Sequence, residues 1–206
     1  MLFRSHGNFY AAQTFSNAPG GRRIQIGWGQ GIAFPGMPFN QQMTFPCELT
    51  LRTTEDGVRM FAEPVKEIEK LHGKRHAWAG KVVKPGENLL AGIEGDLFEV
   101  RGDFEVKGVD AVEISIRGVP VVYDVKKQQL SCRGVTAPLT APGGRVRLRL
   151  LIDRGSIEAF GNGGRVALSV GVIPADDNRS LGLSARGSLR VRSLEVFELK
   201  SAWAKP

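Results

Sequence analysis

The sequence predicts an all-β protein, in which a two-sheet, lectin-like β-sandwich follows a four-stranded antiparallel sheet of the kind that forms one propeller blade. Apolar and polar residues alternate in many segments, as at Val112, Ile114 and Ile116, and this is the period of a half-buried strand. Turn-forming residues separate such segments at intervals of about eight to twelve residues, as in sandwiches. Apolar residues at helical spacing stand out in one short stretch, around Ile68.

The first region, residues 1–64, contains four predicted strands. One of them alternates Ile24, Ile26 and Trp28 with polar residues, and the four cover residues 9–15, 22–28, 43–52 and 58–64. A four-stranded antiparallel meander is one propeller blade. A blade normally packs its apolar faces against two neighbours. We therefore expect the faces of this blade to be covered by the sandwich or by a second copy of the chain in a homo-oligomer.

Residues 65–87 are predicted to form a linker. Val65, Ile68 and Leu71 have the spacing of a short amphipathic helix, and Gly73 ends it. A basic stretch over 74–76 follows.

Residues 88–206 are predicted to form the sandwich. Arg145, Arg147 and Arg149 alternate with apolar residues, so one face of that strand is polar. A hairpin over 156–170 turns at the Gly-Asn-Gly-Gly sequence of 161–164. The other strands are expected near residues 98–106, 112–116, 121–125, 130–132, 181–184 and 189–197.

Composition excludes several classes of partner. The 206 residues carry a net charge of +7, but Lys and Arg are spread along the chain rather than clustered, so we expect no nucleic-acid partner. We expect no membrane partner either, because no apolar run approaches membrane-spanning length. The first residues lack the apolar segment of a signal peptide. The localisation therefore stays open between a cytoplasmic protein and a part of a secreted one.

The sequence predicts neither a metal site nor a cofactor. Cys47 and Cys132 are far apart and lack a metal-type spacing. His72 and His76 are four residues apart, but Gly73 interrupts any helix between them, and no third ligand is near.

Four stretches carry a family resemblance. They are Asn-Phe-Tyr-Ala-Ala-Gln-Thr-Phe (8–15), Ile-Gln-Ile-Gly-Trp (24–28), Gln-Met-Thr-Phe-Pro-Cys-Glu-Leu (42–49) and Asp-Arg-Gly-Ser-Ile-Glu-Ala-Phe (153–160), the last followed by Asn-Gly-Gly. In this order they resemble the C-terminal part of glycoside hydrolase family 32, the invertases, levanases and inulinases: the last propeller blade and the C-terminal sandwich module. The resemblance runs from about residue 6 to the end. Cys47 stands where the family usually has Arg, and Asn8 where many members have Asp.

The resemblance implies hydrolysis of β-fructofuranosidic bonds in a fructose-containing oligo- or polysaccharide: sucrose, inulin or levan. Retaining glycosidases need two carboxyl groups across the scissile bond. The family's acidic motifs, Asn-Asp-Pro, Arg-Asp-Pro and Glu-Cys, do not occur in this sequence, where Cys47-Glu48 has the reverse order. We therefore predict no catalytic residue in this chain and expect the chain alone to be inert.

The same resemblance implies that Tyr10 and Trp28, with Gln13 as a weaker candidate, contact the fructosyl unit of a substrate. An aromatic face covers the C–H surface of a sugar, and a phenol hydroxyl bonds its hydroxyl groups. The alternative is that both rings only pack between blades. Asp153 and Glu158 are expected to form ion pairs with neighbouring arginines (Arg147, Arg149 and Arg154) rather than to catalyse.

Two other functions remain open. One is a stand-alone, lectin-like module that binds an oligosaccharide without cleaving it. The other is a purely structural sandwich that stabilises a propeller or mediates dimerisation.

Overall fold

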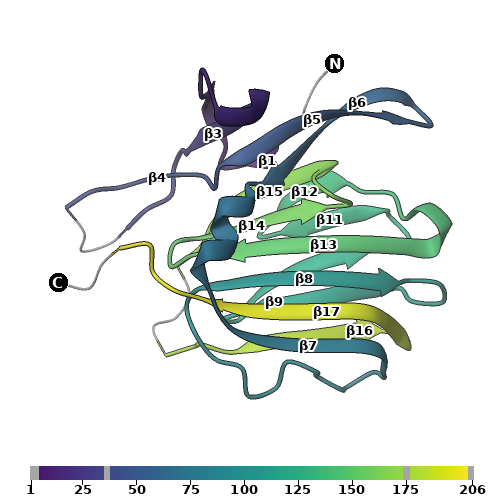
Figure 1. Ribbon diagram of the computed structural model, residues 1–206. Helices are drawn as coiled ribbons and strands as arrows, with labels where there is room; N and C mark the ends of the chain where they lie inside the picture. Colours follow the sequence, from purple (N-terminus) through teal and green to yellow (C-terminus); the bar gives the residue numbers. More distant parts are fainter. Residues whose placement is uncertain (1–4, 35–37, 174–176, 204–206) are drawn as a thin grey trace.

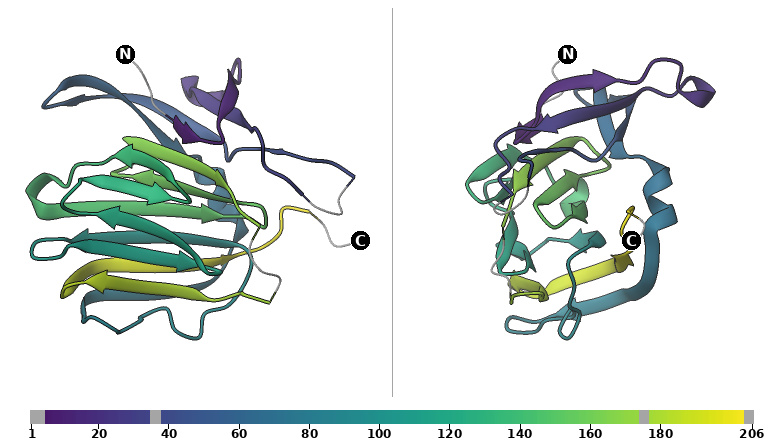
Figure 2. Two further views of the ribbon diagram at one scale, coloured as in Figure 1. Left: turned by 180° about the vertical axis from the view of Figure 1, so that it is seen from behind. Right: turned by 90° about the vertical axis from the view of Figure 1, so that its left-hand side faces the viewer.

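The computed structural model describes residues 5–34, 38–173 and 177–203. Two stacked sheets form a β-sandwich, and a third sheet, from the N-terminal part of the chain, lies against one side of it (Figure 1). Figure 2 shows from two further directions that this N-terminal sheet covers one end of the sandwich, with a short helix leading away from it. The prediction of an all-β sandwich is confirmed.

The larger sheet of the sandwich has seven strands. All neighbouring strands are antiparallel except at one edge, where the first strand runs parallel to its partner. In spatial order they are β1 (Ser5–Gly7), β15 (Val166–Gly171), β14 (Ser156–Gly161), β13 (Arg145–Ile152), β8 (Phe98–Glu105), β17 (Leu189–Leu199) and β7 (His72–Val83).

The smaller sheet has five antiparallel strands. In spatial order they are β12 (Val135–Pro138), β11 (Gln129–Cys132), β10 (Val119–Asp124), β9 (Ala111–Ile116) and β16 (Leu181–Arg186). The core lies between the two sheets, and the predicted inward residues Val112, Ile114 and Ile116 are fully buried in it. Tyr123 is also fully buried, and its hydroxyl donates to the Leu139 carbonyl at 3.0 Å, so its polar atom is satisfied. A one-turn 3-10 helix, η3 (Pro142–Gly144), precedes β13.

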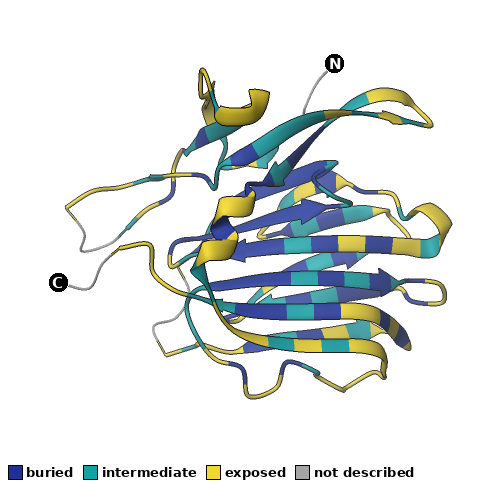
Figure 3. Cartoon of the chain, viewed as in Figure 1, coloured by how far each residue is buried: buried dark blue, intermediate teal, exposed yellow. Residues whose placement is uncertain are grey.

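The outer face of the larger sheet is polar over most of its width and covered over the rest. Along β13 buried and more exposed residues alternate, whereas every residue of β14 is buried (Figure 3). Both faces of β14 are covered because the N-terminal sheet packs on its outer side. This contact forms a second, smaller apolar cluster of Cys47, Ala62, Val65, Ile68, Leu151, Phe160 and Ala167.

The N-terminal sheet is antiparallel and follows the four predicted strands. Its order is β2 (Tyr10–Thr14), β3 (Ile24–Gly29), β5 (Cys47–Thr54) and β6 (Gly57–Pro64). A 3-10 turn, η1 (Pro19–Gly21), joins the first two, and the short β4 (Gln42–Met43) pairs with β3. Residues 35–37 of the loop before β4 lie outside the described residues. That this sheet is a propeller blade remains a prediction.

One glycine fixes how closely the N-terminal sheet approaches the sandwich. The Ala62 amide donates to the Gly164 carbonyl at 2.9 Å, which joins β6 to the β14–β15 turn. Gly164 has a φ of +78°, and a Cβ there would lie 2.0 Å from the Ala62 carbonyl oxygen. Any side chain would therefore be strained and would also collide with the backbone of β6.

The structure differs from the expected linker over 65–87. The short helix expected there is a 3-10 helix, η2 (Lys66–Leu71), which buries Ile68. The basic stretch over 74–76 lies in β7, the edge strand that pairs with β17 along most of its length. This strand was not predicted because most residues of β7 are exposed. Its sequence therefore shows little of the apolar–polar alternation of a half-buried strand.

Candidate functional site

Tyr10 and Trp28, the predicted sugar-contacting residues, lie side by side on the N-terminal sheet. They face each other across the β2–β3 pair, with ring centroids 6.0 Å apart and planes at 60°. Tyr10 is 59% exposed, and Trp28 is partly buried. Met43 pairs with Trp28 from the other side and is also exposed. The three side chains together form an apolar surface across β2, β3 and β4.

Gln13 lies opposite Ile26, two residues before Trp28 on β3, because the register shifts between Tyr10 and Gln13. The shift puts Gln13 on the same face of the sheet as Tyr10 and Trp28, although it is not paired with Trp28. Ala11, inside that shift, has a φ of +44°. Such a bulge is typical of a strand that changes the direction of its side chains.

Glycines on either side of Trp28 hold β3 close to the structure behind it. A Cβ at Gly27 would lie 2.5 Å from the Phe9 ring, and one at Gly29 would lie 2.8 Å from Ile32. The Gly27 amide donates to the buried Thr44 hydroxyl at 2.9 Å. Because side chains alternate along a strand, the Trp28 ring points away from this packed side.

Asp153 and Glu158 do not form the expected ion pairs. Glu158 is completely buried under the N-terminal sheet, where it accepts a hydrogen bond from the Phe45 amide at 2.8 Å and one from the Ser169 hydroxyl at 3.2 Å. Asp153 accepts from the Arg154 backbone amide. Among the described residues, no ion pair joins either carboxylate to a neighbouring arginine. The expected pairing was wrong because the face that carries Glu158 is covered rather than solvated.

Burial also controls the protonation of Glu158. Removal from water disfavours the charged form and raises the pKa of Glu158 to about 8, although its two hydrogen bonds act in the opposite direction. The neighbouring Cys47 thiol is buried as well, and burial raises its pKa. Both groups are therefore largely uncharged at neutral pH and serve as parts of an interface.

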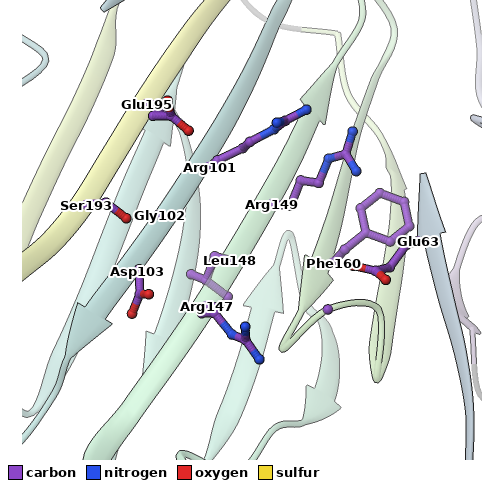
Figure 4. A pocket seen from close by; sticks show the side chains of 11 residues that line it. Glu63, Arg101, Gly102, Asp103, Arg147, Leu148, Arg149, Phe160, Ser193 and Glu195 are labelled. Atoms are coloured by element: carbon purple, nitrogen blue, oxygen red, sulfur yellow. The ribbon is translucent and has the colours of Figure 1, made fainter. Parts of the chain in front are cut away.

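A concavity that was not predicted from the sequence lies on the outer face of the larger sheet. It has a volume of about 320 Å³ and is bordered by β6 and by the β14–β15 turn (Figure 4). Its lining is rich in charge: Glu63, Arg101, Gly102, Asp103, Arg147, Leu148, Arg149, Phe160, Gly163, Ser193 and Glu195. The arginines at alternate positions of β13 were the only sequence signal for it.

Within residues 5–34, 38–173 and 177–203, no three His, Cys, Asp or Glu side chains are grouped to hold a metal ion. No helix in the same ranges has the length and apolar character needed to span a membrane.

Comparison with known proteins gives consistent matches. The sequence model described as "Glycosyl hydrolases family 32 C terminal" matches residues 67–198. The levanase of Bacillus subtilis (strain 168) is 30% identical over 235 aligned residues, which cover 98% of this chain and 35% of that protein. The levanase of Bacillus sp. (strain L7) is also 30% identical, over 95% of this chain and 24% of that protein. The chain thus spans about a third or less of these relatives.

Solved structures match over nearly the whole chain. The exo-inulinase of Aspergillus awamori superposes with a TM-score of 0.83 at 23% identity, over 96% of this chain and 44% of that one. Fructan 1-exohydrolase IIa of Cichorium intybus, solved in complex with 1-kestose, gives a TM-score of 0.78 at 18% identity, over 98% of this chain and 50% of that one. At these identities the structural matches establish the fold.

Proposed function

Because the chain belongs to the C-terminal part of glycosyl hydrolase family 32, we propose that it supplies scaffold and part of the sugar-pocket wall of a β-fructosidase. Its relatives include levanases, an exo-inulinase and β-fructofuranosidases, and the proposed substrate is accordingly a fructose-containing oligo- or polysaccharide. The catalytic carboxylates would come from residues outside this sequence.

The observation that carries this proposal is the Tyr10–Trp28 pair. Large aromatic side chains are normally buried, yet here the two rings adjoin on the side of β3 that faces away from the sandwich. Gly27 and Gly29 let β3 lie close to the structure behind it, and the two rings pack edge to face. A partly exposed aromatic surface is suited to stacking on a sugar ring.

The chain alone is expected to release no fructose from sucrose, inulin or levan. A two-carboxylate mechanism cannot proceed without the acidic motifs that the sequence lacks. The positive control is a chimera in which this chain replaces the matching segment of the Bacillus subtilis levanase, and we expect the chimera to be active. Hydrolysis by the purified chain that disappears on mutation of one of its own carboxylates would refute the proposal.

In the active chimera, Trp28→Ala is expected to lower kcat/KM by roughly ten- to a hundredfold, because a stacked ring contributes on the order of 1–3 kcal/mol by analogy with base stacking. The melting temperature should change little. Trp203→Ala removes a ring that is 83% exposed and should leave both quantities unchanged.

Other outcomes separate the alternatives. If Trp28→Ala lowers the melting temperature and leaves kcat/KM intact, the ring only packs between blades. If the chain alone binds 1-kestose in calorimetry but the chimera is inactive, the chain is a lectin-like module. If neither binding nor activity is found, it is a structural module.

A further inference from the structure

We propose that the groove on the outer face of the larger sheet binds a small oxyanion-bearing ligand, a sugar acid or a sugar phosphate, through the guanidinium group of Arg147. This site is separate from the Tyr10–Trp28 surface and does not depend on the function proposed above. It follows from the way in which the charges of three neighbouring strands are matched.

The groove is formed by outward-facing side chains of β13, β8 and β17. Its floor at Gly102 and Leu148 is backbone, because the side chain of Leu148 points into the core and Gly102 has none. Charged side chains stand around this floor, and Glu63 of β6 closes one side (Figure 4). A volume of about 320 Å³ lies at the lower end of the range for small-molecule sites.

Every carboxylate that lines the groove already has an arginine partner. Glu63 is paired with Arg52, and Glu195 with Arg75 at 2.6 Å. Asp103 lies directly opposite Arg147 in the strand register. It bonds instead to the neighbouring Arg145, whose Nε donates to it at 2.6 Å.

Arg147 is consequently left with an uncompensated charge. Among the described residues its guanidinium group has no hydrogen-bond or ion-pair partner. Arg149, two residues along the same strand, points to the same side. The Arg149 side chain donates to Glu99 and to the Pro64 carbonyl, but its Nη2 is buried without a partner.

At the other end of the groove, a buried carboxylate compensates two neighbouring arginines. Arg101 and Arg149 face each other directly across β8 and β13, a like-charge arrangement that is unfavourable. The buried Glu99 lies between them and accepts from their Nε atoms at 2.7 and 2.5 Å. The carboxylate beside Arg147, that of Asp103, is bonded to Arg145 instead, so among the described residues none bridges Arg147 in this way.

A ligand oxyanion would bind beside Arg147, as the Glu99 carboxylate does beside Arg101 and Arg149. A guanidinium group binds carboxylate and phosphate in the same forked geometry, through strong charge-assisted hydrogen bonds. The Ser193 hydroxyl and the paired carboxylates of Asp103 and Glu195 line the groove nearby and can bond the hydroxyl groups of a sugar. The guanidinium group and these hydrogen-bonding groups together favour a ligand that carries an anionic group on a polyol.

Calorimetric titration of the whole chain at low salt with galacturonate, inorganic phosphate and neutral galactose tests this proposal. Galacturonate and phosphate are expected to bind, and galactose is not. Arg147→Gln should weaken the binding of both anions about tenfold, the equivalent of about 1.4 kcal/mol. Arg147→Lys keeps the charge but not the fork and should weaken binding less. If galacturonate binds much more tightly than inorganic phosphate, the ligand of the groove is a sugar acid. If glucose 6-phosphate, titrated in the same way, binds more tightly than galacturonate, the ligand is a sugar phosphate.

Arg192→Gln is the matched control, because Arg192 is exposed on β17 and does not line the groove. Equal weakening by Arg192→Gln and Arg147→Gln would mean unspecific attraction to a basic protein and would overturn the proposal. Equal binding of galactose and galacturonate, or no binding of either anion at millimolar concentration, would also overturn it. Arg147 is exposed, so its variants should keep the melting temperature of the parent chain.

Discussion

Glu99→Gln is expected to lower the free energy of unfolding by about 3–5 kcal/mol, the usual cost of removing one partner from a buried ion pair. The Glu99 side chain is fully buried and bonds to Arg101, Arg149 and His72, the last at 2.6 Å. An amide would leave Arg149 without an ion-pair partner among the described residues, close to Arg101, which would keep only the half-exposed Glu69. Urea unfolding followed by circular dichroism measures the loss.

Glu105→Gln is the control for this prediction. Glu105 stands on the same strand and pairs with Arg190 at 3.6 Å, with both side chains largely in solvent, so its replacement should cost less than about 1 kcal/mol. Equal losses for the two variants would contradict a special role for the Glu99 cluster.

The effect of Glu99 should also depend on pH. Burial favours the neutral acid, but the Arg101 hydrogen bond and the Arg149 charge outweigh it and hold the pKa of Glu99 below its ordinary value. A carboxylate with a lowered folded-state pKa stabilises the protein above its unfolded pKa, and this contribution is lost as the pH falls through the folded pKa. The difference in the free energy of unfolding between the parent and Glu99→Gln should therefore become smaller at acidic pH.

Glu158→Gln is expected to make the protein more stable than the parent at alkaline pH. The pKa of Glu158 is raised by burial to about 8, against about 4.3 in an unfolded chain. Its contribution to stability is therefore complete below pH 4 and is lost as the pH rises towards 8, by up to about 1.4 kcal/mol per pH unit. Glutamine retains an acceptor for the Phe45 amide and has no charge to bury.

Thermal unfolding between pH 5 and pH 9 tests this expectation. The melting temperature of the parent should fall more steeply with pH than that of Glu158→Gln, and the two curves should converge or cross near the acidic end. Glu55→Gln removes a charge from the exposed β5–β6 turn and should leave the slope unchanged. Parallel curves for parent and Glu158→Gln would show that Glu158 ionises without cost, and hence that the interface admits water.

The strands with one polar face could be predicted from sequence because their periodicity is local. Ile24, Ile26 and Trp28 alternate within a single strand, as do the inward residues of β9. β1 gave no such signal, since it has only three residues and its partner, β15, is near the other end of the chain. Pairing between such distant segments depends on the whole fold and leaves no pattern in either segment.

The candidate sites were predicted unevenly for a related reason. Tyr10 and Trp28 lie side by side because they belong to one hairpin, and their contact with a sugar stays a prediction. The burial of Glu158 was missed because alternation assigns it to an outward face. Phe160 and Leu151 lie on that same face, and two large apolar residues on a supposedly solvated surface were the sign that another element covers it.

The parallel pairing of β1 with β15 has a consequence for the order of events during synthesis. β1 leaves the ribosome before its partner, because Ser5 pairs with Ala167, and at typical elongation rates that partner follows roughly 10–30 s later. Meanwhile the N-terminal sheet can close its own local hairpins, whereas its buried side has no surface to cover it. A nascent chain of this protein therefore presents that apolar side to solvent or to chaperones until β14 and β15 have emerged. Slowed translation before residue 156 should increase its capture by a chaperone.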